Sequence, residues 1–142
     1  MDVKPHRSDR PQRNWVEIAA KVYGGTALFV AAFQIVLALG APLGRFAMGG
    51  TFTGVYPPWM RAGAVIQAGL LLLMAAVVIA RAGLALPRLY EESRWMIWLV
   101  VGLGALAFLL NLITPSSGER MIWAPVAFVQ LVTSLTVALR RA

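Results

Sequence analysis

Four carboxamide side chains lie within the most apolar parts of this chain. They are Gln34, Gln67, Asn111 and Gln130, and Thr133 and Ser134 follow the last of them by three and four residues. This spacing places Gln130 and the two hydroxyls on one face of a helix. An amide in an apolar environment must find hydrogen-bond partners, and each amide offers two donors and an acceptor oxygen. These six residues are the candidate polar seam or pocket.

Two interpretations of these side chains are open. The favoured one is that the amides form hydrogen bonds between helices, each contributing about 0.6 to 2 kcal/mol, where small residues let the backbones approach. The alternative is an outward-opening polar pocket that binds a small molecule or a lipid headgroup. Thr133 and Ser134 have a simpler alternative as well, because hydroxyls in membrane helices often donate to their own backbone carbonyls.

Residue types that carry most catalytic chemistry are scarce. The chain has no cysteine, which excludes disulfides, thiol chemistry and cysteine metal sites. The single histidine, His6, lies in the polar N-terminal segment and leaves no candidate haem ligand or proton relay in the apolar stretches. None of the six acidic residues lies within an apolar stretch, whereas proton-coupled pumps usually place a carboxylate at membrane depth. We therefore expect no catalytic residues, no cofactor, no metal site and no enzymatic activity.

The elements that position the amides are four long apolar stretches. Hydrophobic residues make up 59% of the chain and charged residues only 13%, against about a quarter charged in soluble domains. The stretches 22–39, 62–80, 95–113 and 121–139 hold no ionisable residue and are long enough to cross a bilayer. The sequence thus predicts an all-α membrane protein, an antiparallel bundle of four transmembrane helices over 15–142. Residues 1–14 are expected to be a disordered basic tail.

The distribution of basic residues predicts the orientation. Ten of the thirteen Lys and Arg residues fall in the termini and in the connection between the second and third stretches. Both termini are therefore expected in the cytoplasm. Eleven Arg against two Lys, with many Ala and Gly, suggest a bacterial origin and hence the inner (cytoplasmic) membrane. The expected partner is the lipid bilayer, and nucleic-acid binding is excluded because no folded basic surface remains to read a groove.

Local signals predict where helices begin and bend. Asn14 is a good N-cap for the first helix and Ser93 for the third. Ser116, followed three residues later by Glu119, forms the pattern of a capping box for the fourth helix. Pro125 lies inside that last helix, so a lost hydrogen bond and a kink are expected there.

The outer connection 40–59, "GAPLGRFAMGGTFTGVYPPW", holds five glycines and three prolines. Its Gly-Gly pair permits a β-hairpin, and the alternative is an irregular cap over the mouth of the bundle. A long loop of this kind tends to be functional. The aromatic residues at this level, expected as an interfacial belt, are Phe46, Tyr56, Trp59 and Trp123. The candidate outer rim consists of Arg45, Arg61, Glu119 and Arg120, interpreted as solvated rim charges rather than a buried cluster.

Three segments carry a resemblance. They are "LALGAPLGRFAMGG", "PPWMRAG" and "TPSSGERMIWAP". With them the chain resembles uncharacterised small bacterial four-helix membrane proteins with a Gly-Ala-Pro-x-Gly outer loop. The resemblance covers nearly all of the chain after residue 15. It implies the same four-helix membrane fold and no activity that can be carried over.

The expected function is non-enzymatic. The favoured role is an accessory or assembly subunit that packs against partner membrane proteins, or against copies of itself as a homo-oligomer, through small-residue helix faces. The alternative is a binder or transporter of a small neutral or lipidic solute, held in an outward-facing polar pocket beneath the 40–59 loop. The two roles differ in whether the amides bond to one another or line an open cavity.

Overall fold

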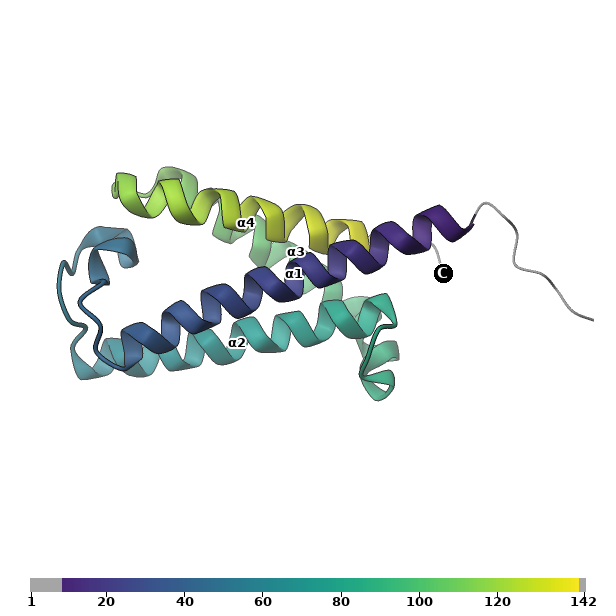
Figure 1. Cartoon of the computed structure of the whole chain (residues 1–142), viewed down its shortest axis with the longest axis horizontal. Helices are drawn as coiled ribbons and strands as arrows, with labels where there is room; N and C mark the ends of the chain where they lie inside the picture. Colours follow the sequence, from purple (N-terminus) through teal and green to yellow (C-terminus); the bar gives the residue numbers. More distant parts are fainter. Residues whose placement is uncertain (1–8, 141–142) are drawn as a thin grey trace, which may run out of the picture.

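The computed structural model describes residues 9–140 and is built from four long helices (Figure 1). They are α1 (Asp9–Ala38), α2 (Pro58–Ala82), α3 (Tyr90–Ile113) and α4 (Ser117–Ala138). Single 3₁₀ turns η1 (Gly44–Phe46) and η2 (Met48–Gly50) lie between α1 and α2, and η3 (Pro87–Leu89) precedes α3. No strand occurs within residues 9–140. The expectation of an all-α fold is confirmed, and all four helices are long and apolar enough to cross a membrane.

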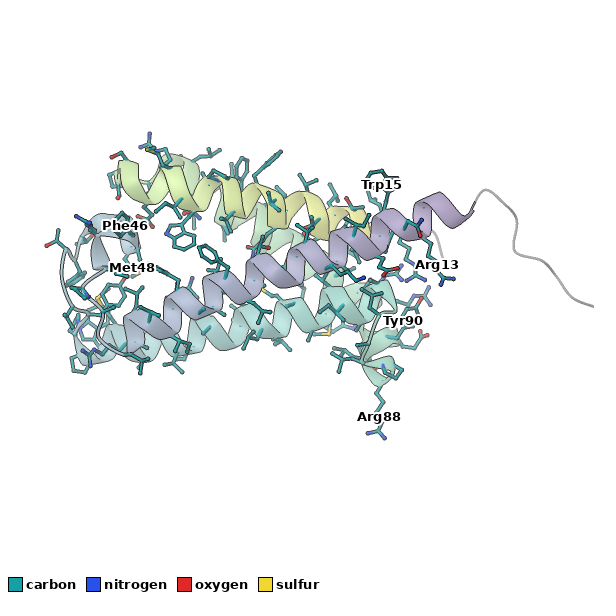
Figure 2. The ribbon with its side chains drawn as sticks, in the orientation of Figure 1. Arg13, Trp15, Phe46, Met48, Arg88 and Tyr90 are labelled. Carbon is teal, nitrogen blue, oxygen red and sulfur yellow. The ribbon has the colours of Figure 1, made fainter. Side chains whose placement is uncertain are left out.

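The two ends of the molecule differ in character. Figure 2 shows Phe46 and Met48 at one end and Arg13, Arg88 and Tyr90 at the other. We call the first the loop end, because it carries the 39–57 connection, and the second the arginine end. At the arginine end each of two arginines donates to the backbone carbonyl of the other: Arg140 Nη1 to Arg81 at 3.0 Å and Arg81 Nη2 to Arg140 at 3.4 Å. These bonds join the C-terminal ends of α2 and α4.

The main core lies toward the arginine end and includes all four helices. Its buried members are mostly small: Val16, Ala19, Ala20, Tyr23 and Ala27 of α1, Ala75, Val77 and Val78 of α2, Ile97 and Val100 of α3, and Val137 and Ala138 of α4. Alanine lets helix backbones approach closely. The two clusters nearer the loop end contain buried residues of α1, α2 and the loop only. The α1–α2 pair and the α3–α4 pair are therefore packed together at one end and separate toward the other (Figure 1).

Two predicted helix starts are wrong. α1 begins at Asp9, so Asn14 lies inside the helix, and residues 9–14 are helical rather than part of a disordered tail. Pro11 sits in the first turn, where a helix tolerates proline. Residues 1–8 lie outside the described part of the chain. α3 begins at Tyr90, directly after the turn that starts at Pro87, and the Ser93 hydroxyl donates to the Tyr90 carbonyl instead of capping the helix.

The start of α4 follows its prediction in part. The Ser116 hydroxyl oxygen accepts the Glu119 backbone N–H at 3.3 Å, as a capping box requires. The Glu119 carboxylate does not complete the box, because it accepts a hydrogen bond from the Thr114 hydroxyl at 3.0 Å. Pro125 lies inside α4 as predicted. The Glu119 carboxylate is thus held at the N-terminal turn by Thr114, two residues before the cap residue Ser116.

Candidate functional site

The 39–57 loop is irregular and forms no β-hairpin. Met48, Gly49 and Gly50 have φ angles of 54°, 71° and 72°. Positive φ at two glycines would suit a hairpin turn, but Gly44–Phe46 and Met48–Gly50 form 3₁₀ turns, and no strand occurs within residues 9–140. The Gly44 N–H donates to the Gly54 carbonyl at 3.2 Å, which draws the two halves of the loop together. Of the two forms that the sequence left open, the irregular one is found.

The loop is fastened to α4 on the far side of the bundle. The Trp123 indole N–H donates to the Phe46 carbonyl at 2.6 Å. The Ser116 hydroxyl donates to the Arg45 carbonyl at 3.2 Å. Because the loop is covalently joined to α1 and α2, these contacts carry it across the gap between the two helix pairs. The loop therefore covers the loop end of the bundle.

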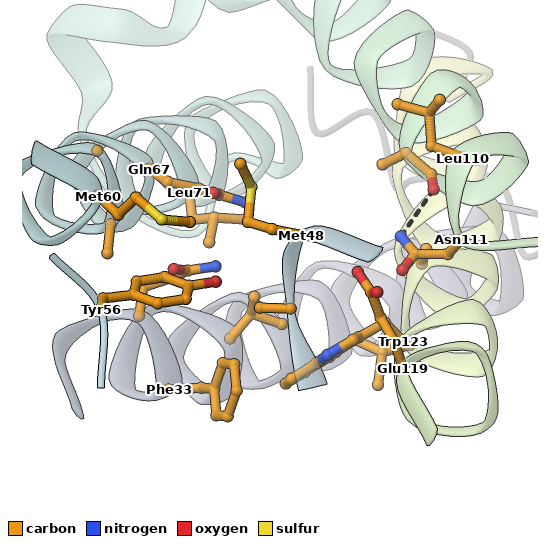
Figure 3. A pocket seen from close by; sticks show the side chains of 18 of the residues that line it. Phe33, Met48, Tyr56, Met60, Gln67, Leu71, Leu110, Asn111, Glu119 and Trp123 are labelled. Carbon is orange, nitrogen blue, oxygen red and sulfur yellow. Dashed lines mark hydrogen bonds between the residues drawn. The ribbon is translucent and has the colours of Figure 1, made fainter. Parts of the chain in front are cut away.

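Beneath the loop lies a cavity of about 520 Å³ (Figure 3). A cavity of this size is typical of sites for small molecules. All four helices and the loop contribute to its lining. The lining residues are Val30, Phe33 and Gln34 of α1; Ala47, Met48 and Tyr56 of the loop; Trp59, Met60, Gly63, Ala64, Gln67 and Leu71 of α2; Ala107, Leu110 and Asn111 of α3; and Glu119, Trp123, Val126, Ala127 and Gln130 of α4.

The structure brings the four predicted amides together in this cavity. Gln34, Gln67, Asn111 and Gln130 all line it. Asn111 Nδ2 donates to the Ala107 carbonyl of its own helix at 2.8 Å. Within residues 9–140 no hydrogen bond joins two of the amides, and the buried Gln130 Nε2 has no partner there. The interhelical hydrogen bonds favoured from the sequence are therefore not found among the described residues.

Thr133 and Ser134 do not belong to the cavity lining. The Thr133 hydroxyl donates to the Val129 carbonyl at 2.7 Å, and the Ser134 hydroxyl donates to the Leu131 carbonyl at 3.0 Å. Both carbonyls belong to α4 itself. These residues follow the simpler alternative, in which a hydroxyl in an apolar helix satisfies its own backbone.

The predicted rim residues divide into two groups. Arg61 Nε donates to the Tyr56 carbonyl at 3.0 Å, Arg120 Nη2 donates to the Thr114 carbonyl at 2.6 Å, and neither side chain lines the cavity. Arg45 lies over the Phe46 ring, 4.6 Å from its centroid, and is also outside the lining. Glu119 alone of the four lines the cavity. Within the described residues Glu119 forms no ion pair with these arginines.

Aromatic residues expected in an interfacial belt form part of the cavity wall. Trp123 packs against Phe33 with ring centroids 4.7 Å apart, and both residues line the cavity with Tyr56 and Trp59. The Tyr56 hydroxyl is buried without a hydrogen-bond partner among the described residues. Burial and the nearby Glu119 carboxylate both raise the pKa of Tyr56. Sequence reasoning missed Phe33 altogether, because nothing in a lone phenylalanine of an apolar helix distinguishes a cavity wall from a lipid-facing position.

Comparisons with known proteins leave the site to be interpreted from its own chemistry. No family model matches the chain, and neither a curated protein nor a solved structure was found to match it.

Proposed function

We propose that this multi-pass membrane protein binds a small amphipathic molecule in the cavity at its loop end, without catalysing a reaction. The observation that carries the proposal is a pair of buried polar atoms in that cavity, the Tyr56 hydroxyl and Gln130 Nε2, that have no partner within residues 9–140. A buried donor left without a partner costs about 1 to 3 kcal/mol. A polar group of a bound molecule offsets that cost, and the apolar wall receives the rest of the molecule.

The proposal includes an arrangement in the membrane. The helices form an antiparallel bundle in a bacterial inner membrane with both termini in the cytoplasm, and the loop end faces outward. The bias of ten to three in Lys and Arg supports this orientation. The cavity then opens toward the outer leaflet, where a small neutral or lipidic solute or a lipid headgroup reaches it.

The loop acts as the cover of the site. Two hydrogen bonds fasten it to α4, from Trp123 and Ser116 to the carbonyls of Phe46 and Arg45. A hydrogen bond contributes only about 0.5 to 1.5 kcal/mol net, so these two can break and re-form at ambient temperature. Release of the loop from α4 exposes the cavity between the helix pairs without unfolding the core at the arginine end.

Native mass spectrometry tests the proposed function. The protein is purified in mild detergent, and its co-purifying small molecules are compared with those of Gln130→Leu and Thr133→Val. We expect one molecule bound to the unmodified protein and to Thr133→Val, because that hydroxyl lies outside the cavity, and at least a tenfold loss in Gln130→Leu. Equal occupancy in all three proteins, or none in any, contradicts the proposal.

The accessory or assembly role expected from the sequence is the second candidate. The observation that favours it is the exposure of α3, which is the least buried of the four helices in the bundle. Exposed side chains along it include Leu99, Leu103, Leu106 and Leu110. Cross-linking in the native membrane tests this role, because a partner protein would be captured from this face, whereas a helix that faces only lipid captures none.

A further inference from the structure

Among the residues that the structure describes, the cavity lining holds one carboxylate and no basic side chain. Of its twenty lining residues, Glu119 is the only acid, and no Lys, Arg or His is among them. Figure 3 shows the Glu119 carboxylate beside Asn111 and Trp123, on the side of the cavity formed by α3 and α4. The Glu119 carboxylate therefore makes the electrostatic potential of the cavity more negative.

Within residues 9–140 Glu119 forms no ion pair with the arginines at the same end. The one hydrogen bond of its carboxylate there comes from the neutral Thr114 hydroxyl, at 3.0 Å. Arg61 and Arg120 donate to backbone carbonyls instead. Glu119 also lies in the first turn of α4, where the helix dipole favours a negative charge. The Glu119 carboxylate is thus available to form an ion pair with a cationic ligand.

The walls around the carboxylate are of the kind that attract organic cations. Tyr56, Trp59 and Trp123 line the cavity, and a cation is drawn to the face of an aromatic ring, most strongly to that of tryptophan. Trp123 already uses its indole N–H on the Phe46 carbonyl, so it offers the site its ring rather than a donor. The pKa of Tyr56 is raised by burial first and by the nearby Glu119 carboxylate second.

We propose that the molecule bound in the cavity is an amphipathic organic cation whose ammonium group pairs with Glu119 against the aromatic wall. This inference rests on the proposed function, the binding of a small amphipathic molecule, and specifies a positively charged ligand in place of a neutral solute. The ammonium group lies toward the α3–α4 side of the cavity, where Glu119 of α4 and Asn111 of α3 are placed. The apolar body extends toward Val30 and Leu71 on the α1–α2 side.

A pair of isosteric probes tests whether the cavity prefers a positively charged ligand. Benzyltrimethylammonium and neopentylbenzene have the same shape, with nitrogen replaced by carbon, and differ by one positive charge. Binding of each is measured in nanodiscs of zwitterionic lipid by tryptophan fluorescence, since Trp59 and Trp123 lie in the wall. We expect the cation to bind at least tenfold more tightly than its uncharged isostere. Equal binding of the two probes, or no binding of the cation, overturns the inference.

The variant Glu119→Gln tests whether Glu119 causes the preference for the cation over its uncharged isostere. Glutamine keeps the length of the residue and can still accept from Thr114, so the start of α4 is preserved. We expect this variant to lose at least tenfold in affinity for the cation and nothing for the isostere. Glu92→Gln, at an exposed carboxylate of the arginine end, is the matched control and should change neither. Unchanged cation affinity in Glu119→Gln overturns the inference. The proposed function is judged separately: if Gln130→Leu still loses the native ligand, the cavity binds an uncharged molecule.

Discussion

Polar residues in the apolar helices of this protein fall into two kinds. Thr133 and Ser134 donate to carbonyls one turn back and need nothing from other helices. Gln130 is buried, and its Nε2 has no partner within residues 9–140. A short hydroxyl reaches its own backbone, whereas the longer amide of a glutamine projects beyond it. The Gln130 amide is therefore available to the molecule whose binding in the cavity we propose.

Two glycines at the loop end give opposite expectations for a single added methyl group. A Cβ at Gly44 would lie 2.8 Å from the Gly54 carbonyl oxygen and closer still to that of Phe52, whereas a Cβ at Gly63 meets open space. We expect Gly44→Ala to lower the free energy of unfolding by about 1 to 3 kcal/mol through overpacking. Gly63→Ala should leave it unchanged or raise it by up to about 1 kcal/mol. Unfolding in mixed micelles measures both, and equal effects would contradict this packing of the loop.

Tyr56 links the cavity to pH. Its pKa in the folded protein is raised above the ordinary value of 10.0, so the neutral phenol is favoured by folding. The stability that this provides is fully present below pH 10 and is lost as the pH rises through the folded pKa. We expect Tyr56→Phe to unfold with a shallower loss of stability above pH 10 than the unmodified protein. Parallel pH profiles would mean that the Tyr56 hydroxyl is solvated.

Residue types predicted part of the site. Amide chemistry and the position of each amide along its helix placed Gln34, Gln67, Asn111 and Gln130 in one region, and the structure brings them to one cavity. Whether amides meet or face a void depends on helix separation to within the length of a side chain, which periodicity does not encode. Glu119 was expected on a solvated rim, because the sequence likewise does not show that the helices leave a cavity beside it.

Among the elements, the loop depends most on one contact with a distant helix. Trp123→Phe removes the 2.6 Å hydrogen bond to the Phe46 carbonyl and keeps an aromatic ring against Phe33. We expect backbone amides of residues 44–56 to exchange hydrogen at least several-fold faster, with about 0.5 to 1.5 kcal/mol lost in stability. Trp59→Phe is the control, because its indole forms no hydrogen bond with any residue of the described part of the chain. Equal exchange in the two variants would contradict the role of Trp123 as the fastening of the loop.

The helices themselves were predictable and their ends only in part. Four apolar stretches of sufficient length predicted four membrane-spanning helices, and residues 9–140 contain four helices long and apolar enough to cross a membrane. Asn14 and Ser93 failed as caps because a helix continues through a good cap residue when the preceding turn is also compatible with helix. Pro11 and Pro87 supply such turns, each in or just before the first helical residues. A cap signal is local, and the residues before it decide whether it is used.

At the scale of the molecule, residue size explains why the helix pairs separate at the loop end. Alanines such as Ala20 and Ala27 are fully buried in the core toward the arginine end and let α1 approach the other helices. Farther along α1, Phe29 and Phe33 pack against Trp123 of α4 with ring centroids 5.9 and 4.7 Å apart. These bulky rings hold α1 away from α4. The cavity lies at this end of the bundle, and Phe33 and Trp123 form part of its wall.

The proposed orientation is tested by labelling single cysteines, since the natural chain has none. Gly54 and Glu91 are both exposed and lie in or beside connections at opposite ends of the bundle. In intact cells a membrane-impermeant maleimide should label Gly54→Cys. It should label Glu91→Cys only after the membrane is opened. The reverse pattern would place the loop end in the cytoplasm and refute the proposed topology.

The free energy of unfolding of the ligand-free double variant Gln67→Leu/Gln130→Leu tests most directly whether the amides line a cavity rather than join helices. Neither amide forms a hydrogen bond to another helix within residues 9–140, and the buried Gln130 Nε2 has no partner there, so we predict that the free energy of unfolding stays the same or rises by up to about 3 kcal/mol. Leucine then replaces polar groups that have no partner. A loss of about 1 kcal/mol or more, the sum expected for two interhelical hydrogen bonds, would contradict the account.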